Sequence, residues 1–549
     1  MHLYKNPFVR DGTLRESRGF NFLMIARGPS FKFVCRIFFA AVWLLLAVVT
    51  VATAQETSHT ERVRTQTLKK ANLGKEINSE YSELSPIISP DGKLLFFTMG
   101  VGNPANLGAD HLQDGYVSRR TQSGGWSQPI NLGLPINSAG NDAISGVSAD
   151  GSVLFIKNFD YNRVNGLCFA KRTAAGWKID SITIDNYSNS NTLASQCISP
   201  DAKFIVYSAE SIEGYGGLDL YVTRQIDASS NHYGTPENLG PVINTAKDDF
   251  APFLASDGQS LYFSSRGHGG YGDADVFVSK RLDDSWVNWT APKNLGPEIN
   301  TQGMDAYYSI PASGDIAYYS SSNGTNHMDL YIVSLSDDIR PNPVILVTGK
   351  VVNQKGAPLE AAITYTRLLT DTSAAATYSS SLTGHFAVVL PFGYEYALRV
   401  ESPGYLPYSD NLDLREATMY RELSSVIVLD SMAIGSTITL RNIFFDLDKS
   451  TLRPESHFEL DRLVELLKHH PKWAVQIEGH TDTLGMEEHN RVLSKSRAEA
   501  VAQYLTSKDI DAKRMTSIGL GSSQPVAPND TEDGRQRNRR VVFRVLRTE

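Results

Sequence analysis

The stretch Asn-Leu-Gly-Lys-Glu-Ile-Asn at 72–78 decides the fold of the first part of this chain, because it recurs. The pattern Asn-Leu-Gly-x-x-Ile-Asn appears again at 131–137, 238–244 and 294–300. A turn that introduces an apolar, aromatic strand recurs beside it, with a period of 51 to 59 residues. Its five copies begin at Ser89, Ser148, Ser199, Ala255 and Ala312. Self-similarity at this period is typical of repeat architectures.

Each repeat has the pattern of a small antiparallel sheet. The segments 94–97, 153–156, 204–207, 261–263 and 316–319 read as second strands. A third strand follows in most copies, and a strand containing Trp126, Trp177 or Trp286 usually closes the unit. Four short strands that cannot bury both faces alone predict an all-β propeller over 60–340 with five blades, or six if another copy has diverged.

These repeats resemble the WD40-like (PD40) β-propeller family, which includes TolB-type periplasmic propellers. The resemblance implies a protein-interaction platform whose partner would be an unidentified envelope protein. Equivalent carboxylates at Asp219, Asp275 and Asp329 suit either turn caps or calcium. Single carboxylates per blade favour caps, so we expect no metal.

Residues 345–430 follow a boundary at Pro341 and Pro343. Short strands with turn signals every 8–12 residues predict a small β-sandwich here. The layout is similar to the carboxypeptidase-regulatory-like domain, a seven-strand module that mostly serves as a spacer. His385 is interpreted as a residue at a strand edge.

The last segment, 440–549, contains Gly-His-Thr-Asp-Thr-Leu-Gly at 479–485 between a predicted strand at 473–477 and a predicted helix at 487–507. Asn490, Ser494 and Arg497 fall on the apolar face of that helix. Buried polar groups need partners, and Asp482 is the partner on offer for Arg497. The two form either a structural ion pair or two sides of a site for a zwitterion, with Asp482 binding an ammonium and Arg497 a carboxylate.

The motifs Gly479-His-Thr-Asp482, Leu493-Ser-x-x-Arg497-Ala and Asn538-Arg-Arg-Val541 resemble the OmpA-like peptidoglycan-binding domain. The resemblance covers about a fifth of the chain, from 443 to 547. It implies an α+β fold that binds the diaminopimelate of the cell-wall peptide stem and favours the zwitterion interpretation. The implied ligand residues are Asp482, Arg497, Thr481, Asn490, Ser494, Asp446 and Arg539. The segment 444–448 would form the first strand, leading to a helix at 454–468 that buries Phe458, Leu460, Leu463, Leu466 and Leu467.

An apolar run at 37–53 with preceding basic residues ends in Ala52-Thr-Ala54. This pattern predicts a secretory signal over 1–54, with Met24 as a possible true start, and the alternative is an uncleaved anchor. Cys35 precedes the apolar run, so a lipidated N-terminus is not indicated, whereas Cys168 and Cys197 would enter an oxidising compartment. We expect export to the periplasm or outer membrane, with indirect membrane association.

With a formal net charge of −8 and no long basic run, the chain is not expected to bind nucleic acid. A propeller also occurs in prolyl-oligopeptidase-type peptidases, but no Gly-x-Ser-x-Gly elbow is present. The cluster Glu478, His480, Asp482 and His489 lacks the spacing of a known metal motif. The sequence therefore predicts a multidomain protein without catalytic activity or cofactor, which binds peptidoglycan and presents its propeller to a partner. The alternative is a subunit of a secretion or motility complex anchored to the wall.

Overall fold

The computed structural model describes residues 70–158, 165–189, 195–211, 213–227, 230–368, 372–446 and 448–548. The chain divides into two units, Met1–Thr67 and Leu68–Glu549, and all of these residues lie in the second. The predicted signal and Cys35 fall outside the described residues. Within them, no helix is both long and apolar enough to cross a membrane.

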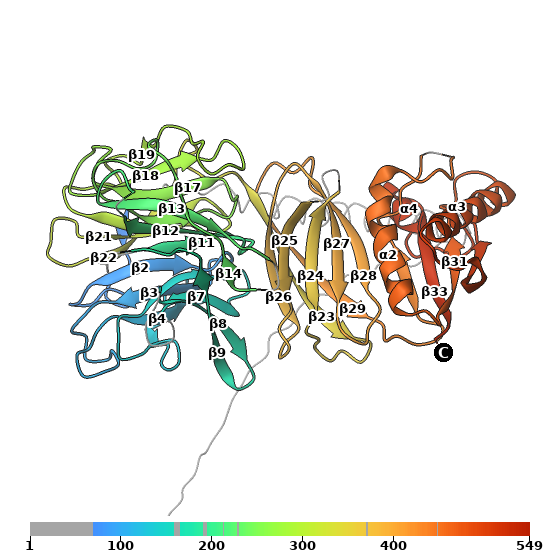
Figure 1. Ribbon diagram of the computed structural model, residues 1–549, viewed down its shortest axis with the longest axis horizontal. Helices are drawn as coiled ribbons and strands as arrows, with labels where there is room; N and C mark the ends of the chain where they lie inside the picture. The colour runs from blue at the N-terminus through green and yellow to red at the C-terminus, as the bar shows by residue number, and fades with distance from the viewer. Residues whose placement is uncertain are drawn as a thin grey trace, which may run out of the picture. The chain divides into compact units, whose positions relative to one another are not determined.

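Five four-stranded sheets are present in the described part of the first 334 residues, in blue to green in Figure 1. Neighbouring strands within each sheet pair antiparallel. In spatial order the sheets are β2 (Glu83–Ile88), β3 (Leu94–Met99), β4 (Asp114–Arg119) and β5 (Ile130–Asn131); β6 (Ala143–Val147), β7 (Val153–Lys157), β8 (Leu167–Thr173) and β9 (Gly176–Ser181); β11 (Gln196–Ile198), β12 (Phe204–Glu210), β13 (Leu218–Arg224) and β15 (Glu237–Asn238); β16 (Asp249–Leu254), β17 (Ser260–Ser265), β18 (Asp275–Lys280) and β19 (Lys293–Asn294); and β20 (Asp305–Ser309), β21 (Ile316–Ser321), β22 (Asp329–Ser334) and β1 (Ala71–Asn72). A short parallel pair joins β10 (Thr183–Ile184) to β14 (His232–Tyr233).

The first strands of successive sheets contact one another in the order β2, β6, β11, β16 and β20, and β20 contacts β2. The last sheet takes its edge strand from the other end of the described chain, because β1 pairs antiparallel with β22. Side-chain bonds tie neighbouring first strands together, as where the amide of Ile88 in β2 donates to Ser309 Oγ in β20 at 3.3 Å. Cys168 and Cys197 are buried and form no disulfide within the described residues, and burial raises the pKa of the Cys168 thiol to about 11.

The repeated asparagines join the third strand of a sheet to the fourth. The side chain of Asn300 donates a hydrogen bond to the carbonyl of Val276 at 3.0 Å and accepts one from the amide of Val276 at 2.8 Å. Asn294 accepts from Asn300 at 2.8 Å and donates to Asp275 at 3.0 Å. The copies at 72–78, 131–137 and 238–244 make the same set of bonds. The motif is therefore structural in all four copies.

The prediction of a closing strand with tryptophan is wrong for two of the three repeats. Trp177 lies in β9, but Trp126 forms only an isolated bridge, and Trp286 lies in a turn with φ of 65°. In the four sheets that contain the motif, the edge strand is the start of Asn-Leu-Gly itself. In each of these sheets, the first asparagine of the motif donates to an aspartate in the third strand, as Asn294 does to Asp275. The segments with Trp126 and Trp286 follow the third strand without forming the fourth.

Residues 344–429 form two further sheets around one hydrophobic core. One has the order β26 (His385–Pro391), β23 (Val344–Asn353) and β29 (Arg421–Leu429). The other has the order β25 (Thr372–Tyr378), β24 (Ala362–Arg367), β27 (Glu395–Glu401) and β28 (Tyr408–Asp413). Buried aliphatic and aromatic side chains alternate along β27 and β24, as expected for strands with one face in a core.

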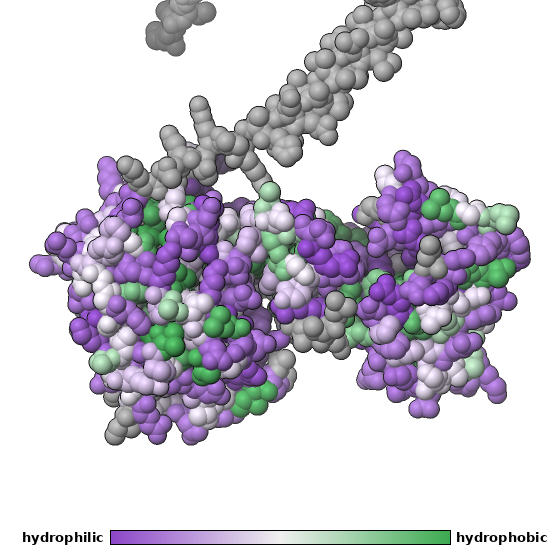
Figure 2. All heavy atoms as spheres, turned by 90° about the horizontal axis from the view of Figure 1, so that it is seen from above, coloured by the Kyte–Doolittle hydropathy of each residue, from purple (hydrophilic) through white to green (hydrophobic). Residues whose placement is uncertain are grey.

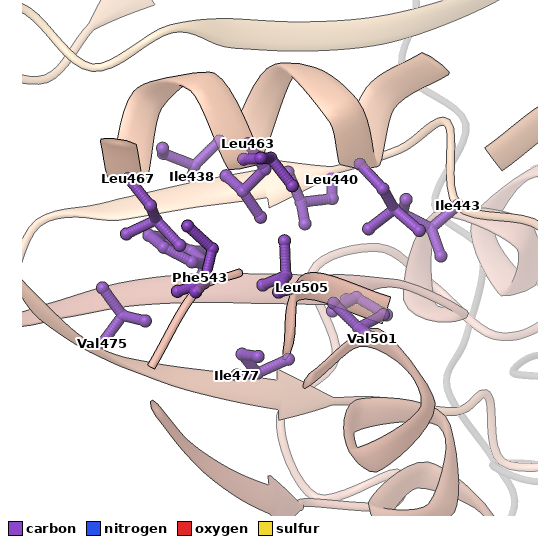
Figure 3. Packing of buried hydrophobic residues seen from close by; sticks show 14 of the residues in the cluster. Ile438, Leu440, Ile443, Leu463, Leu467, Val475, Ile477, Val501, Leu505 and Phe543 are labelled. Atoms are coloured by element: carbon purple, nitrogen blue, oxygen red, sulfur yellow. The ribbon is translucent and has the colours of Figure 1, made fainter. Parts of the chain in front are cut away.

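The C-terminal α+β part contains a four-stranded sheet in the order β30 (Thr437–Leu440), β33 (Val541–Arg547), β31 (Ala474–Gly479) and β32 (Met515–Gly519). Its helices are η1 (Pro454–Ser456), α2 (His457–His469), α3 (Glu487–Ser507), η2 (Ala512–Arg514) and α4 (Glu532–Asn538). One core joins this sheet to α2 and α3, and Figure 3 shows Leu463, Leu505 and Phe543 within it.

Two expectations about this part are corrected. The first strand is β30, because the predicted strand at 444–448 forms only a bridge from Phe445 to Leu452 within its described residues. Helix α2 buries Leu460, Leu463 and Leu467, but Phe458 and Leu466 are only half-buried. Phe458 instead lies under Arg462, whose guanidinium is 3.6 Å from the ring centroid.

Candidate functional site

The candidate site lies where the end of β31 contacts the first half of α3. A Cβ atom at Gly479 would be 1.9 Å from the carbonyl oxygen of Ser494, so only glycine permits this approach. A Cβ atom at Gly519, the end of β32, would be 2.4 Å from the carbonyl oxygen of Arg491. Two strand ends thus lie against the helix, and the loop at 480–486 is held beside its N-terminal turns.

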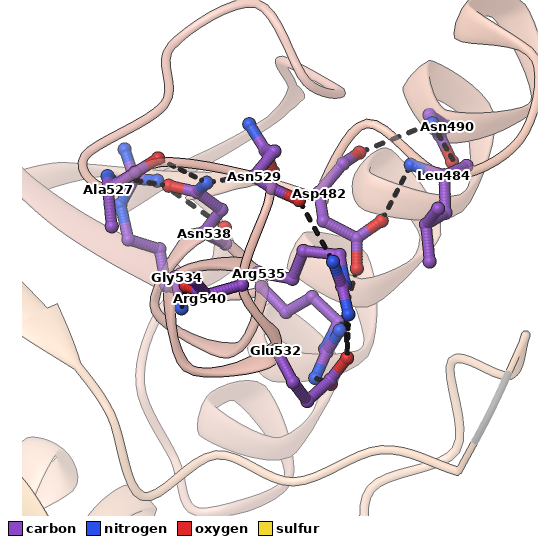
Figure 4. A network of polar contacts seen from close by, with 12 residues as sticks. Asp482, Leu484, Asn490, Ala527, Asn529, Glu532, Gly534, Arg535, Asn538 and Arg540 are labelled. Atoms are coloured by element: carbon purple, nitrogen blue, oxygen red, sulfur yellow. Dashed lines mark hydrogen bonds and ion pairs between the residues drawn. The ribbon is translucent and has the colours of Figure 1, made fainter. Parts of the chain in front are cut away.

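Asp482 is 6% exposed and both of its carboxylate oxygens accept hydrogen bonds. Oδ1 accepts from the amide of Leu484 at 2.9 Å, and Oδ2 accepts from Arg539 Nη1 at 2.7 Å. Arg539 also pairs with Glu532 at 2.7 Å. Figure 4 shows the bond from the amide of Leu484 to Asp482 within the polar network. The carboxylate is therefore held in one orientation by contacts from two directions.

Arg497 is 8% exposed and its guanidinium binds main-chain oxygens. Nε donates to the carbonyl of Lys449 at 3.0 Å, and Nη2 donates to that of Asp446 at 3.4 Å. Nη1 has no hydrogen-bond partner within the described residues. Burial lowers the pKa of Arg497, as does the charge of Arg539, while Asp448 and Asp482 oppose this.

Of the two interpretations of Asp482 and Arg497, the structural ion pair is therefore not the one that the structure contains. Among the described residues, the carboxylate pairs with Arg539, and Arg497 forms no ion pair with it. The two charges are still close enough to interact, because the negative charge of Asp482 partly opposes the lowering of the Arg497 pKa. The prediction that Asn490, Ser494 and Arg497 lie on the buried face of α3 is confirmed.

Asn490 and Ser494 hold the backbone around the site. Asn490 Nδ2 donates to the carbonyl oxygens of Leu484 at 2.9 Å and Asp482 at 3.4 Å. Ser494 Oγ accepts from the amide of Gly521 at 3.0 Å. These two residues fix the loops that carry the charged groups, so their side chains act through the backbone.

Thr481 and Asp446 differ in the exposure and hydrogen bonding of their side chains. The hydroxyl of Thr481 is buried and has no hydrogen-bond partner in the described structure, while its amide donates to the carbonyl of Gly521 at 2.9 Å. The Asp446 side chain is 53% exposed and lies 3.2 Å from Lys449 Nζ, and its main-chain oxygen receives Arg497. The site thus contains an unused hydroxyl and an unused guanidinium nitrogen.

His480 is a residue whose environment the sequence did not reveal. It is 2% exposed, and neither ring nitrogen has a hydrogen-bond partner within the described part of the chain. Its Nε2 lies 4.0 Å from Glu478, which is paired with Arg544. Burial, with the charge of Arg540, lowers the pKa of His480 to about 4. No group of three metal-ligating side chains occurs among the described residues, so His480 is not part of one there.

Comparison with known proteins covers the region that holds this site. Residues 444–539 match the OmpA family. The C-terminal part of this chain is an OmpA family domain. The chain is 42% identical to outer membrane protein A of Bordetella avium over 19% of its own length and 53% of that protein. It is 37% identical to the peptidoglycan-associated lipoprotein of Brucella melitensis over 18% of its length and 60% of that protein.

Outer membrane porin F of Pseudomonas fluorescens is 40% identical over 19% of this chain and 32% of that protein. The chain thus spans less than two thirds of the length of these curated relatives. Among solved structures, a cell wall anchor of the T6SS from Pseudomonas aeruginosa is 32% identical over 20% of this chain and 78% of that one, with a TM-score of 0.18.

Proposed function

We propose that this chain is a non-catalytic cell-envelope protein that binds peptidoglycan through its C-terminal domain, at the diaminopimelate of the peptide stem. The observation that carries the proposal is the buried site of Asp482 and Arg497, which lies inside the segment that matches the OmpA family. The name of the Brucella relative, a peptidoglycan-associated lipoprotein, supports the ligand class.

The proposed ligand group is a zwitterion, and each of its charges has a counterpart in the site. The ammonium binds the carboxylate of Asp482, which Arg539 and the amide of Leu484 hold in place. The carboxylate accepts from Arg497 Nη1, which has no partner within the described residues, and from the hydroxyl of Thr481. The Thr481 hydroxyl is buried without a partner in the described structure, which is costly, so its hydrogen bond to a ligand is favourable.

In this proposal Asn490, Ser494 and Asp446 are positioning residues. Asn490 and Ser494 hold the loops, and the carbonyl of Asp446 receives Arg497. Two charge-assisted contacts of about 1.5–3 kcal/mol each give only modest affinity per stem. The many stems of a polymeric wall then raise the overall affinity through rebinding.

We also propose that the five sheets are the blades of a β-propeller over 60–340, which presents a protein-interaction surface. Contacts between the first strands from β2 through β20 and back to β2, together with the pairing of β1 with β22, support this architecture. The sheets at 345–430 then act as a spacer before the wall-binding domain at 440–549. The relatives from the outer membrane support a location in the periplasm or at the outer membrane.

The test is a pull-down of the full chain on purified peptidoglycan of the diaminopimelate type. Asp482→Asn and Arg497→Lys are compared with the parent, and Arg491→Ala is the matched control because it lies on the exposed face of the same helix. We expect the parent and control to sediment with the wall and both site variants to lose most of this binding. If folded site variants sediment as the parent does, or if the parent does not sediment, the proposal is wrong.

A further inference from the structure

Two neighbouring sheets carry the same loop before their third strand. Gly214-Tyr-Gly216 precedes β13, and Gly270-Tyr-Gly272 precedes β18. The amide of Tyr215 donates to Asp219 at 2.6 Å, and the amide of Tyr271 donates to Asp275 at 2.5 Å. Both carboxylates are buried and also accept from a motif asparagine. The main chain at each tyrosine is therefore anchored to the sheet below it.

The glycine after each tyrosine packs directly on the backbone that enters the next sheet. A Cβ atom at Gly216 would lie 2.4 Å from the carbonyl carbon of Ala246, and one at Gly272 would lie 2.2 Å from the carbonyl oxygen of Thr301. No larger residue fits without moving main chain. Both loops are thus fixed from two sides, and each holds its tyrosine at a defined position.

The tyrosine side chains make little use of this support within the protein. They are 51% exposed at Tyr215 and 50% exposed at Tyr271. Neither hydroxyl has a hydrogen-bond partner and neither ring has an aromatic contact among the described residues. Apolar side chains are scattered over the face seen in Figure 2, and single exposed ones need no explanation. Two equivalent tyrosine rings on rigid loops do call for an explanation, because a partner that binds them orders little of the loop backbone and so costs little conformational entropy.

A charged bridge connects the two loops. Asp248 accepts from the amide of Leu218 at 3.1 Å and pairs with Arg266 at 2.8 Å. Arg266 pairs in turn with Asp273, in the second loop, at 3.1 Å. The guanidinium of Arg266 thus pairs with two carboxylates, and the side chain of Asp273 is still 55% exposed. The groups left for a ligand are tyrosine faces and carboxylate oxygens, and both attract cations.

We propose that Tyr215 and Tyr271, together with the exposed Asp273 of the second loop, form a docking surface for a protein segment that carries arginine or lysine side chains. The inference rests on the proposed interaction role of the sheets and names the surface and the partner's chemistry. Guanidinium and ammonium groups bind over tyrosine faces and pair with carboxylates, whereas a neutral glycan could donate hydroxyl hydrogen bonds to Asp273 but would gain no charge attraction from it. The chain's formal net charge of −8 adds attraction at longer range.

The test measures binding of a fluorescent Arg-Gly decapeptide to the full chain by polarisation at low salt, beside a Glu-Gly decapeptide and a chito-oligosaccharide. The double variant Tyr215→Ala/Tyr271→Ala keeps both main-chain bonds, so the loops are retained. Tyr215→Phe/Tyr271→Phe keeps the ring faces. Tyr378→Ala, at a tyrosine that is 66% exposed on β25, is the matched control.

We expect the Arg-Gly peptide to bind and the Glu-Gly peptide not to bind. The alanine pair should weaken binding by about tenfold, while the phenylalanine pair and Tyr378→Ala bind as the parent does. Equal binding by the alanine pair, or equal binding of both peptides, overturns the proposal. Loss of chito-oligosaccharide binding in the alanine pair would assign the surface to a glycan instead. All variants should still sediment with peptidoglycan, which separates failure here from failure of the wall-binding proposal.

Discussion

The sheets at 71–334 and the C-terminal domain both bury polar side chains, but they do so in different ways. In the sheets, the bonds of Asn300 and Asn294 are made again in three other copies. In the C-terminal domain, Asp482, Arg497 and His480 each occur in a unique environment. A buried polar group that recurs with the same partners is part of the architecture, whereas one that occurs once is a candidate for function.

Unpartnered atoms alone do not separate these two cases. Buried carboxylate oxygens without a partner recur in the sheets, at Asp114, Asp219, Asp275 and Asp329. The C-terminal domain has Thr481 Oγ1 and both ring nitrogens of His480. The repetition is therefore the informative property, and the following variants test it.

Asn300→Ala should have the largest effect on stability and none on wall binding. It removes bonds to the amide and carbonyl of Val276 and to Asn294, and it leaves buried groups without partners. We expect the free energy of unfolding of the sheets to fall by about 4 kcal/mol in urea titrations. The exposed Asn288→Ala should change it by less than about 0.5 kcal/mol. A small effect of Asn300→Ala would mean that the repeated asparagines are not structural.

His480 should make the C-terminal domain sensitive to acid. Its folded-state pKa of about 4 lies below the usual 6.5, so the folded state binds fewer protons between these values. The contribution to stability is complete above pH 6.5 and is lost as the pH falls through 4, about 3 kcal/mol in all.

Calorimetry of the parent and of His480→Leu over this range checks the prediction. The ring nitrogens make no hydrogen bonds within the described structure, so leucine removes the charge without leaving partners unsatisfied. A variant that remains as acid-sensitive as the parent would show that other groups control the transition.

Glu83, at the start of β2, should also make stability depend on pH. The sign is opposite to that of His480, and the size of the effect is no greater. The side chain is fully buried, and burial raises the pKa of Glu83 to about 7 although Ser79 donates two hydrogen bonds to it. Its contribution to stability is complete below pH 4.5 and is lost as the pH rises through 7. Glu83→Gln should make the transition of the sheets flatter over this range, measured in the same calorimetric series. Parallel curves for parent and variant would contradict this.

Asp446→Ala should have the smallest effect. Among the described residues, its exposed side chain pairs with Lys449 alone, and Arg497 binds its main-chain oxygen, which alanine retains. We expect a stability change below about 0.5 kcal/mol and little change in peptidoglycan sedimentation. A loss of sedimentation as large as that of Asp482→Asn would make the Asp446 carboxylate part of the ligand site.

Much of the local structure was predictable because it depends on residues close in sequence. The helix predicted at 487–507 coincides with α3, and the polar residues predicted on its inner face are buried. The apolar second strands of the repeats lie within a few residues of their expected positions. Turns and helices depend on residues only a few positions apart, so their patterns can be read directly from the sequence.

The errors concern partners that lie far apart in the chain. Asp482 could have paired with any nearby arginine, and its partner, Arg539, is 57 residues away. The sequence predicts no strand at β5, and its role as the edge of the sheet becomes visible only through its pairing with β4. The pKa of His480 is lowered by burial and by the charge of Arg540, which is distant in sequence, and spacing does not reveal this.

The pairing of β1 with β22 also fixes an order of events during synthesis. The hydrogen bond between Asn72 and Asp329 spans 257 residues, so the first described strand emerges from the ribosome long before its partner. Until β22 is made, β1 has no sheet to join, and afterwards the edge of β22 stays open until β1 returns. Contacts of such long range form slowly and leave unpaired edges exposed to aggregation. The last sheet is therefore completed only when β1 pairs with β22, and until then one edge of β22 has no partner strand.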